Sequence, residues 1–348
     1  MTPAAFAIPG DINLPTGGYM YDRRVLALLP QFGIAARHLE LPGSFPDPSE
    51  ADLAETARIL AGVAAGTVLI VDGLAYGALP AELINGVRAS IVALVHHPLC
   101  LEAGLPEARR RQLLGLETAA LALAKRVVVT SAATARTLHA DFGVEAGKTT
   151  VAEPGTDPAQ RARGSAGSLQ LLSVGSIVPR KAYDVLVRAL APLRDRDWQL
   201  AIAGATDRSL EALAALHAAI RETGLQERVI LSGAVAPERL SEMYASADVF
   251  LLPSLYEGYG MVLAEAMARG LPIVCTTGGA AAETAPDAAA IKVPPGDQGA
   301  LTDAIRGLLG EPDLRRHMAD ASWIAGQKLP RWEDTARTIA GVIEELRG

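Results

Sequence analysis

The sequence predicts an α/β protein with two doubly wound parallel sheets, and three observations carry this prediction. Short apolar runs alternate with helix-length segments along the whole chain, which is the pattern of strand, crossover helix and parallel strand. The apolar runs end in Gly, Pro, Ser or His, as strands bounded by turns do. The chain has 348 residues, which is typical of roughly two domains rather than one.

Candidate strands occur in equal number in the two halves of the sequence. The six in the first half are Ala4–Ile8, Ile34–Leu39, Thr67–Val71, Ser90–Val95, Arg126–Thr130 and Thr149–Ala152. The six in the second half are Leu169–Val174, Gln199–Ala203, Arg228–Leu231, Asp248–Leu252, Pro272–Cys275 and Ala289–Val293. Each half therefore predicts one sheet.

The segment Pro158–Ser168 separates the two halves. It is rich in Pro, Gly, Ser, Ala and Arg and has no apolar periodicity, so it is interpreted as a linker. The predicted domains are residues 1–165 and 166–330. Residues 331–348 follow as an amphipathic helix, whose packing partner the sequence leaves open, with the N-terminal domain as one candidate. Open parallel sheets bind ligands outside the carboxyl ends of their strands, so we expect the two domains to face each other across a cleft.

Composition excludes several classes of protein. Hydrophobic residues make up 50% and charged residues 20% of the chain, which is typical of a globular protein. The formal net charge of −7 disfavours a broad nucleic-acid-binding surface. Cys100 and Cys275 are the only cysteines, which disfavours a disulfide framework or a structural zinc site and favours a reducing cytoplasm. Met1–Ile8 has no basic region and no apolar run reaches ~20 residues, so we expect neither a signal peptide nor a membrane span.

Two cations follow the first strand of the second half. Arg180 and Lys181 lie between Gly175 and a helix-length apolar pattern. They are therefore at the N-terminal end of the predicted helix, where the helix dipole disfavours positive charge. Backbone amides and cations at such a strand end form an anion site. Two solvated surface cations are the alternative interpretation.

A second candidate site begins at Glu257, directly after a predicted strand. Gly258 and Gly260 allow close backbone approach to a ligand, and a helix that begins near Gly260 directs its first N–H groups toward a phosphate. Glu265 lies one to two turns along this helix among apolar residues, where sugar or ribose hydroxyls would satisfy its carboxylate. An ion pair with Arg269 is the alternative.

Two further candidates come from the first half. Gly17 and Gly18 begin a helical pattern and form a potential amide nest, although a plain tight turn fits the same residues. His96 ends the predicted strand Ser90–Val95, where a histidine suits acid–base or hydrogen-bonding chemistry. His97 competes with His96 for this role, and a buried structural histidine is the alternative for both.

Several common nucleotide motifs are absent from the sequence. There is no GxGxxG with an acidic residue about 20 positions later, no GxxxxGK[ST] and no GxSxG. A nicotinamide-dependent dehydrogenase is therefore disfavoured, and the sequence has no Walker phosphate loop.

Together, these residues resemble glycosyltransferase family 4, whose members are retaining enzymes with the GT-B fold. The resemblance is strongest over Leu169–Asp297, in SVGSIVPRKAYDVLVRAL, the E-x7-E pattern from Glu257 to Glu265, TTGGAAAE and PPGD. It extends through PTGGYMYD, VHHP and EPGTD in the first half.

The resemblance implies a role for each candidate. Lys181 would contact the donor diphosphate, Glu265 the nucleotide ribose and Glu257 the donor sugar, and His96 would be the strand-end histidine. The family commonly has Arg at the position of Ser176, and we hypothesise that Arg180 supplies the missing charge. The implied catalytic residues are His96, Glu257, Lys181 and Arg180. The implied donor-binding residues are Gly17, Gly18, Ser176, Arg180, Lys181, Val235, Glu257, Tyr259, Gly260, Met261, Val262 and Glu265.

The expected function is transfer of a sugar from a nucleoside diphosphate sugar to an acceptor hydroxyl, with no metal and no resident cofactor. A sugar-nucleotide epimerase and a non-catalytic sugar-binding protein are the alternatives. An amphipathic stretch begins at Arg109, Arg110 and Arg111. Contact with the inner face of a membrane is one interpretation of these arginines, and a solvated start of a helix is the other. The sequence leaves open the nucleotide base, the sugar, the acceptor, the linkage and the oligomeric state.

Overall fold

A computed structural model describes residues 2–347 and divides them into two units. The first unit comprises residues up to 155 together with those from 330 onward, and the second comprises residues 156–329. The division falls before the predicted boundary at 165/166. Residues of the predicted linker lie along the second unit, where Ala162 and Arg163 donate main-chain hydrogen bonds to Arg269 and Ala245.

The first unit contains one parallel six-stranded sheet, in the order β2-β1-β3-β4-β5-β6. Its strands are β1 (Thr2–Pro9), β2 (Ile34–Leu41), β3 (Val68–Asp72), β4 (Ser90–Val95), β5 (Arg126–Val129) and β6 (Thr149–Val151). Its helices are α1 (Gly17–Leu28), α2 (Glu50–Ala61), α3 (Gly73–Tyr76), α4 (Ala81–Asn85), α5 (Glu107–Leu123), α6 (Ala132–Phe142) and α14 (Trp332–Glu345).

The second unit repeats this architecture with the strand order β12-β11-β10-β7-β8-β9, again parallel throughout. Its strands are β7 (Leu169–Val174), β8 (Trp198–Ala203), β9 (Val229–Gly233), β10 (Val249–Leu252), β11 (Ile273–Thr276) and β12 (Ala290–Val293). Its helices are α7 (Tyr183–Leu190), α8 (Leu210–Thr223), α9 (Pro237–Ser246), α10 (Met261–Ala268), α11 (Ala281–Thr284), α12 (Gln298–Gly310) and α13 (Pro312–Gly326).

The prediction of two doubly wound parallel sheets is therefore confirmed, and every predicted strand is present to within two residues at its ends. The central strands are buried on both faces because helices cover both sides of each sheet, which explains their continuous apolar runs. Because all strands of a sheet are parallel, their carboxyl ends lie along one edge. In each unit, the strand-end residues discussed below lie on that edge.

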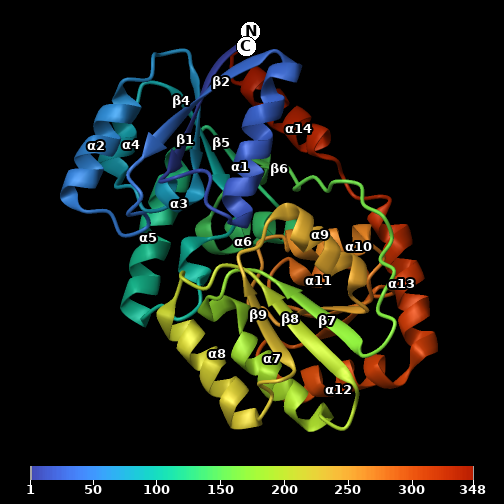
Figure 1. The fold of residues 1–348 in the computed structure, drawn as a ribbon. Helices are drawn as coiled ribbons and strands as arrows, with labels where there is room; N and C mark the ends of the chain where they lie inside the picture. Colours follow the sequence, from blue (N-terminus) through green and yellow to red (C-terminus); the bar gives the residue numbers. More distant parts are fainter. Residues whose placement is uncertain (1, 348) are drawn as a thin grey trace. The chain divides into compact units, whose positions relative to one another are not determined.

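The C-terminal helix α14 completes the first unit. It packs against α1, and the Trp332 ring meets the Tyr21 ring edge-on at a centroid distance of 5.9 Å. The Glu153 carbonyl accepts a hydrogen bond from the Thr335 hydroxyl, and Arg347 donates to the Thr2 hydroxyl, so the start of β1 lies beside the residues that follow α14 (Figure 1). The helix predicted after residue 330 thus packs on the N-terminal sheet unit.

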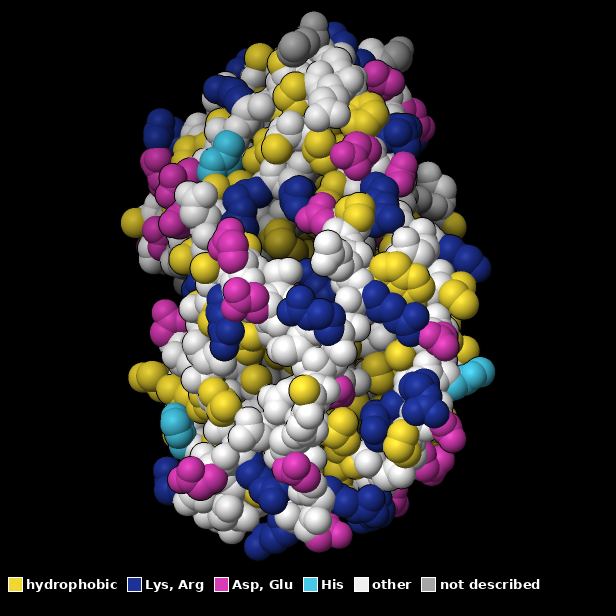
Figure 2. Space-filling view, turned by 45° about the vertical axis from the view of Figure 1, so that its right-hand side comes forward, with side chains coloured by type: hydrophobic (Ala, Val, Ile, Leu, Met, Phe, Trp, Pro, Cys, Tyr) yellow, Lys and Arg dark blue, Asp and Glu magenta, His cyan; other side chains and the backbone are white. Residues whose placement is uncertain are grey.

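Charges are mixed on the surface. Lys and Arg side chains are interspersed with Asp and Glu side chains over the face drawn in Figure 2. This mixture on that face agrees with the slightly acidic balance of the sequence. No helix within residues 2–347 is long and apolar enough to cross a membrane.

Candidate active site

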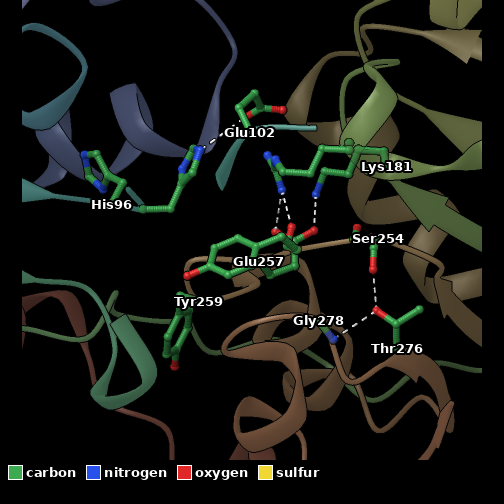
Figure 3. Close-up of polar contacts among 12 residues, drawn as sticks. His96, Glu102, Lys181, Ser254, Glu257, Tyr259, Thr276 and Gly278 are labelled. Carbon is green, nitrogen blue, oxygen red and sulfur yellow. Dashed lines mark hydrogen bonds and ion pairs between the residues drawn. The ribbon is translucent and has the colours of Figure 1, made fainter. Parts of the chain in front are cut away.

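The centre of the candidate site in the second unit is an ion pair between Lys181 and Glu257. Lys181 Nζ lies 2.6 Å from Glu257 Oε1, and Arg180 Nη1 lies 3.3 Å from Glu257 Oε2 (Figure 3). Lys181 and Glu257 are buried. The structure therefore brings together two strand-end segments that lie 76 residues apart in the sequence.

Arg180 and Lys181 form a 3₁₀ turn, Pro179–Lys181, between β7 and α7. Arg180 also donates to the carbonyl of Tyr256 at 2.7 Å, and its own carbonyl accepts from the N–H of Leu255. These bonds tie the segment after β7 to the segment after β10. Arg180 thus holds the Glu257 segment in addition to adding charge.

The charge on Glu257 follows from this environment. Burial raises the pKa of Glu257, but Lys181 and Arg180 lower it more strongly, to about 2. Glu257 is therefore ionised at neutral pH. The three groups together carry one net positive charge, since two cations face one carboxylate.

The Glu257 segment is held from the other side by the segment after β11. Glu257 donates its N–H to the carbonyl of Gly278 and accepts from the N–H of Ala280. Gly279 has φ +63°, and a Cβ there would lie 2.4 Å from the carbonyl oxygen of Glu257. Only glycine permits this close approach.

Gly260 is the N-cap of α10, with φ +88°. No side chain caps this helix, so the first N–H groups of Met261 and Val262 are available at its N-terminus. Such N–H groups suit an anion. The Tyr259 ring packs into the apolar core beside α10, and Val235 packs against the same core. Ser176 is half-buried directly after β7 and Gly175.

Glu265 accepts a hydrogen bond from the Tyr244 hydroxyl at 2.8 Å. Arg269 donates to the main-chain carbonyl of Glu265 and lies over the Tyr244 ring at 4.4 Å, so among the bonds of the described residues it does not bind the Glu265 side chain directly. Burial raises the pKa of Glu265, while Tyr244 and Arg269 lower it in part. Tyr244, on α9, is a residue that sequence reasoning missed, because nothing in its local pattern links it to Glu265.

In the first unit, Gly17 and Gly18 form the first turn of α1, which the Thr16 hydroxyl caps by accepting from the N–H of Tyr19. A Cβ at Gly18 would lie 3.3 Å from Cδ2 of His96. Gly18 therefore borders the His96 ring. His97 points to a different partner, with Nε2 3.1 Å from Glu102.

His96 also contacts two carboxylates that sequence reasoning missed. Its Nε2 lies 3.2 Å from Asp22 Oδ1 and 3.2 Å from Asp72 Oδ2. Asp72 ends β3, so the strand-end rule that found His96 would also have found Asp72. Within residues 2–347, these three are the group with the ligand types and spacing to hold a metal ion.

The three arginines considered for lipid contact have partners within the first unit. Arg109 pairs with Asp47 and donates to the carbonyl of Pro46, and Arg110 donates to the carbonyl of Cys100. Arg111 pairs with Glu107. These contacts favour a structural role, and membrane contact stays a prediction. Cys100 and Cys275 are buried free thiols.

Comparisons with known proteins find similar chains among glycosyltransferases. Residues 159–322 match the family described as glycosyl transferases group 1. A D-inositol 3-phosphate glycosyltransferase from Nocardia farcinica is 34% identical over 68% of this chain and 57% of its own length. An MMP alpha-(1->4)-mannosyltransferase from Mycolicibacterium hassiacum is 29% identical over 86% of this chain and 76% of its own length. The match to the Nocardia protein thus spans little more than half of that relative.

Solved structures show the same fold. Sucrose-phosphate synthase from Thermosynechococcus elongatus superposes with a TM-score of 0.82 at 22% identity, over 99% of both chains. HepE from Anabaena, in complex with UDP and glucose, gives 0.74 at 17% identity over 97% of this chain and 99% of its own. The two Rossmann-like units are therefore those of the GT-B class. Residues 159–322, which match the glycosyl transferases group 1 family, contain the Lys181–Glu257 site.

Proposed function

We propose that the protein is a retaining glycosyltransferase, which moves a sugar from a nucleoside diphosphate sugar to an acceptor hydroxyl. The observation that carries the proposal is the cluster of buried Lys181 and Glu257 with half-buried Arg180, at the carboxyl ends of β7 and β10. A buried cluster with an excess positive charge favours an anionic ligand. The donor is a co-substrate, and the proposal requires no resident cofactor.

The excess charge has a defined task in this reaction. As the bond between the sugar C1 and the leaving oxygen breaks, negative charge grows on the diphosphate. Lys181, Arg180 and the N–H groups at the start of α10 stabilise that charge, and removal of one such donor lowers the rate about 10²–10³-fold. Glu257 is ionised, so it accepts hydrogen bonds from sugar hydroxyls and orients the donor.

Glu265 gives the site its second anchor. Its carboxylate accepts from Tyr244 through one oxygen, which leaves acceptor capacity for the hydroxyls of a ribose. A diphosphate at Lys181 and a ribose at Glu265 together describe a nucleoside diphosphate. The acceptor is assigned to the first unit, whose strand-end edge carries His96.

The relatives support the reaction class and give a range of substrates. One is named an inositol phosphate glycosyltransferase and another a mannosyltransferase, so a sugar or cyclitol phosphate is a reasonable first acceptor class to test. The base and sugar of the donor are to be found by direct binding.

Calorimetric titration with UDP, GDP, ADP and NAD tests the proposal. We expect one nucleoside diphosphate to bind, and we expect Lys181→Ala to abolish binding. Lys328→Ala is the matched control, because Lys328 is an exposed cation in the same unit. Absence of binding at millimolar concentration would overturn the proposal. Retention is then tested by NMR of the anomeric configuration of the product.

A further inference from the structure

The first unit contains two buried carboxylates to which the proposed reaction gives no role. Asp22 lies on α1, Asp72 ends β3 and His96 follows β4, so three elements meet at this cluster. His96 Nε2 lies 3.2 Å from Asp22 Oδ1 and 3.2 Å from Asp72 Oδ2. Both carboxylates are buried, whereas the His96 side chain is 21% exposed.

The charges within this cluster do not balance. Two carboxylates carry two negative charges, and one imidazole supplies at most one positive charge. Within residues 2–347, no lysine or arginine forms an ion pair with either Asp22 or Asp72. The ionised cluster therefore keeps at least one negative charge in a buried place, which is unfavourable unless a further cation neutralises it.

One oxygen of the cluster also has no hydrogen bond. Asp22 is fully buried, and its Oδ2 has no hydrogen-bond partner among the described residues. Asp72, by contrast, accepts the N–H of Leu74 at Oδ1 and faces His96 with Oδ2. Buried polar atoms in folded proteins are nearly always hydrogen-bonded, so an exception such as Asp22 Oδ2 points to a ligand.

The positions of the three side chains suit one metal ion. Asp22, Asp72 and His96 each offer one ligand atom, and these atoms lie within 4.8 Å of one another. Zinc binds imidazole nitrogen and carboxylate oxygen at ~2.0–2.2 Å, so two ligand atoms of one tetrahedral ion lie ~3.2–3.5 Å apart. The two 3.2 Å distances from Nε2 agree with this separation. The same distances suit hydrogen-bonded ion pairs, but ion pairs leave the net charge and Asp22 Oδ2 unmatched.

Neighbouring groups hold the ligands in these positions. The Tyr21 ring meets the His96 ring edge-on at 5.2 Å, and a Cβ at Gly18 would lie 3.3 Å from His96 Cδ2. The N–H of Leu74 holds the Asp72 carboxylate at 2.8 Å. Groups that orient metal ligands in this way typically raise metal affinity about 10–100-fold.

We propose that Asp22, Asp72 and Nε2 of His96 bind one divalent cation of the zinc class. Imidazole nitrogen suits zinc and its first-row neighbours, whereas Mg²⁺ and Ca²⁺ prefer oxygen ligands. Three protein ligands leave the fourth position of a tetrahedral ion to water, which the partial exposure of His96 admits. The sequence had predicted no metal, an expectation that came with the family resemblance.

A proton held between the two carboxylates is the competing explanation. It would also reduce the negative charge of the cluster, but it would give the chain no affinity for zinc. Zinc binding requires Nε2 and both carboxylates to be unprotonated, so any proton that they carry passes to the buffer when the ion binds.

The test is calorimetric titration of the full chain with zinc chloride, after dialysis against EDTA and without nucleotide. We expect one equivalent of Zn²⁺ to bind with micromolar or tighter affinity and to raise the Tm. Mg²⁺ should bind at least about tenfold more weakly. Asp22→Asn, Asp72→Asn and His96→Gln should each weaken zinc binding about tenfold or more. Asn keeps the side-chain oxygen that accepts from Leu74, and far-UV circular dichroism checks that each variant folds.

Co²⁺ provides a spectroscopic readout of the same site. Four-coordinate Co²⁺ absorbs visible light, and we expect the native chain to develop this absorption with one equivalent of the ion. His96→Gln should abolish it, because the imidazole ligand is lost.

His97→Gln is the matched control, because His97 is adjacent in the chain and its Nε2 lies 3.1 Å from a single carboxylate, that of Glu102. It should leave zinc affinity and the Co²⁺ spectrum unchanged. Absence of zinc binding by the native chain at micromolar concentration would overturn the proposal, whether or not the variants fold. So would zinc affinity that all three cluster variants retain, or that His97→Gln abolishes.

The proposal uses residues of the first unit alone and does not rest on the proposed function. Because the titration contains no nucleotide, its outcome is independent of the calorimetric test with nucleoside diphosphates. Zinc binding without nucleotide binding would sink only the proposed function, and the reverse result would sink only the metal site.

Discussion

Lys181 and Arg180 each take one oxygen of the Glu257 carboxylate, at 2.6 Å and 3.3 Å. If either cation is removed, one oxygen of the buried Glu257 carboxylate therefore loses its ion-pair partner. The ion pair is therefore both a structural unit and the charged centre of the proposed donor site.

The first prediction concerns the coupling within this pair. Removal of one partner of a buried pair typically costs about 3–5 kcal/mol, and replacement of both costs much less. We expect Lys181→Met to lower the free energy of unfolding by about 3 kcal/mol, because Arg180 still faces Glu257. The double variant with Glu257→Gln should recover part of this loss, because it removes the unpaired carboxylate oxygen but leaves Arg180 without its ion pair. Urea denaturation in a double-mutant cycle measures both.

The exposed pair of Arg239 and Glu242 is the control for this cycle. Its removal should change the free energy of unfolding by less than about 1 kcal/mol. Equal losses for the single and double variants would contradict the assigned coupling.

The second prediction concerns Gly260, whose φ of +88° is unfavourable for other residues. A Cβ there would also lie 3.1 Å from Cδ1 of Leu263. Gly260→Ala should cost about 1–2 kcal/mol of stability and weaken nucleotide binding, because the first N–H groups of α10 move. Gly307→Ala is the matched control: it lies inside α12 with nothing near its added Cβ, so it should stabilise by up to about 1 kcal/mol.

The third prediction concerns Tyr244, which positions Glu265 by a hydrogen bond. Tyr244→Phe removes this donor but keeps the ring that stacks on Phe250 and lies under Arg269. We expect about tenfold weaker nucleotide binding, because a hydrogen bond to a charged group contributes about 1.5 kcal/mol or more.

Tyr76→Phe provides a comparison for this variant, since Tyr76 also donates from a buried hydroxyl, to Ala120 in the first unit. It should lower stability without changing nucleotide affinity. Calorimetry with the bound nucleotide distinguishes the two, and unchanged affinity in Tyr244→Phe would contradict the role given to Tyr244.

The fourth prediction concerns the pH dependence of stability. Glu117 is buried on α5, accepts from the N–H of Leu99 and has no hydrogen bond to Oε1 among the described residues. Burial raises the pKa of Glu117 from 4.5 to about 8. Between these pH values, Glu117 is thus more fully protonated in the folded chain than in the unfolded chain. The contribution of this proton to the free energy of unfolding is full below pH 4.5 and is lost as pH rises toward 8.

Glu117→Gln removes this titration and keeps an oxygen for Leu99. We expect the variant and the native protein to be similarly stable at pH 4.5, and the variant to be more stable at pH 9 by on the order of 3 kcal/mol. Denaturation at both pH values measures the difference. Glu82→Gln should show no such pH-dependent gain, and parallel curves for Glu117→Gln and the native protein would refute the prediction.

The sequence alone was sufficient to predict both sheets and part of the candidate site. Continuous apolar runs such as Val68–Asp72 are typical of strands covered on both faces, and the strand-end rule led from them to Lys181 and His96. The roles of these residues stay predictions until binding is measured.

Other parts depend on contacts distant in sequence. Asp22 lies in the middle of α1, and only the packing of that helix shows that it contacts His96, 74 residues later. Tyr244 and Glu265 likewise meet because α9 and α10 pack beside the same sheet. Helical periodicity predicts that a position is buried, but it does not identify the side chain that it contacts.

The packing of the C-terminal helix α14 on the first unit has a consequence for synthesis on the ribosome. Residues 156–329 form a continuous unit, which can fold as soon as it has emerged. The first unit lacks α14 until residues 332–345 have been translated, so the nascent chain leaves Tyr21 and its apolar neighbours on α1 uncovered during elongation. The first unit is therefore completed only after the whole of the second unit has been translated, because α14 follows the second unit in the chain.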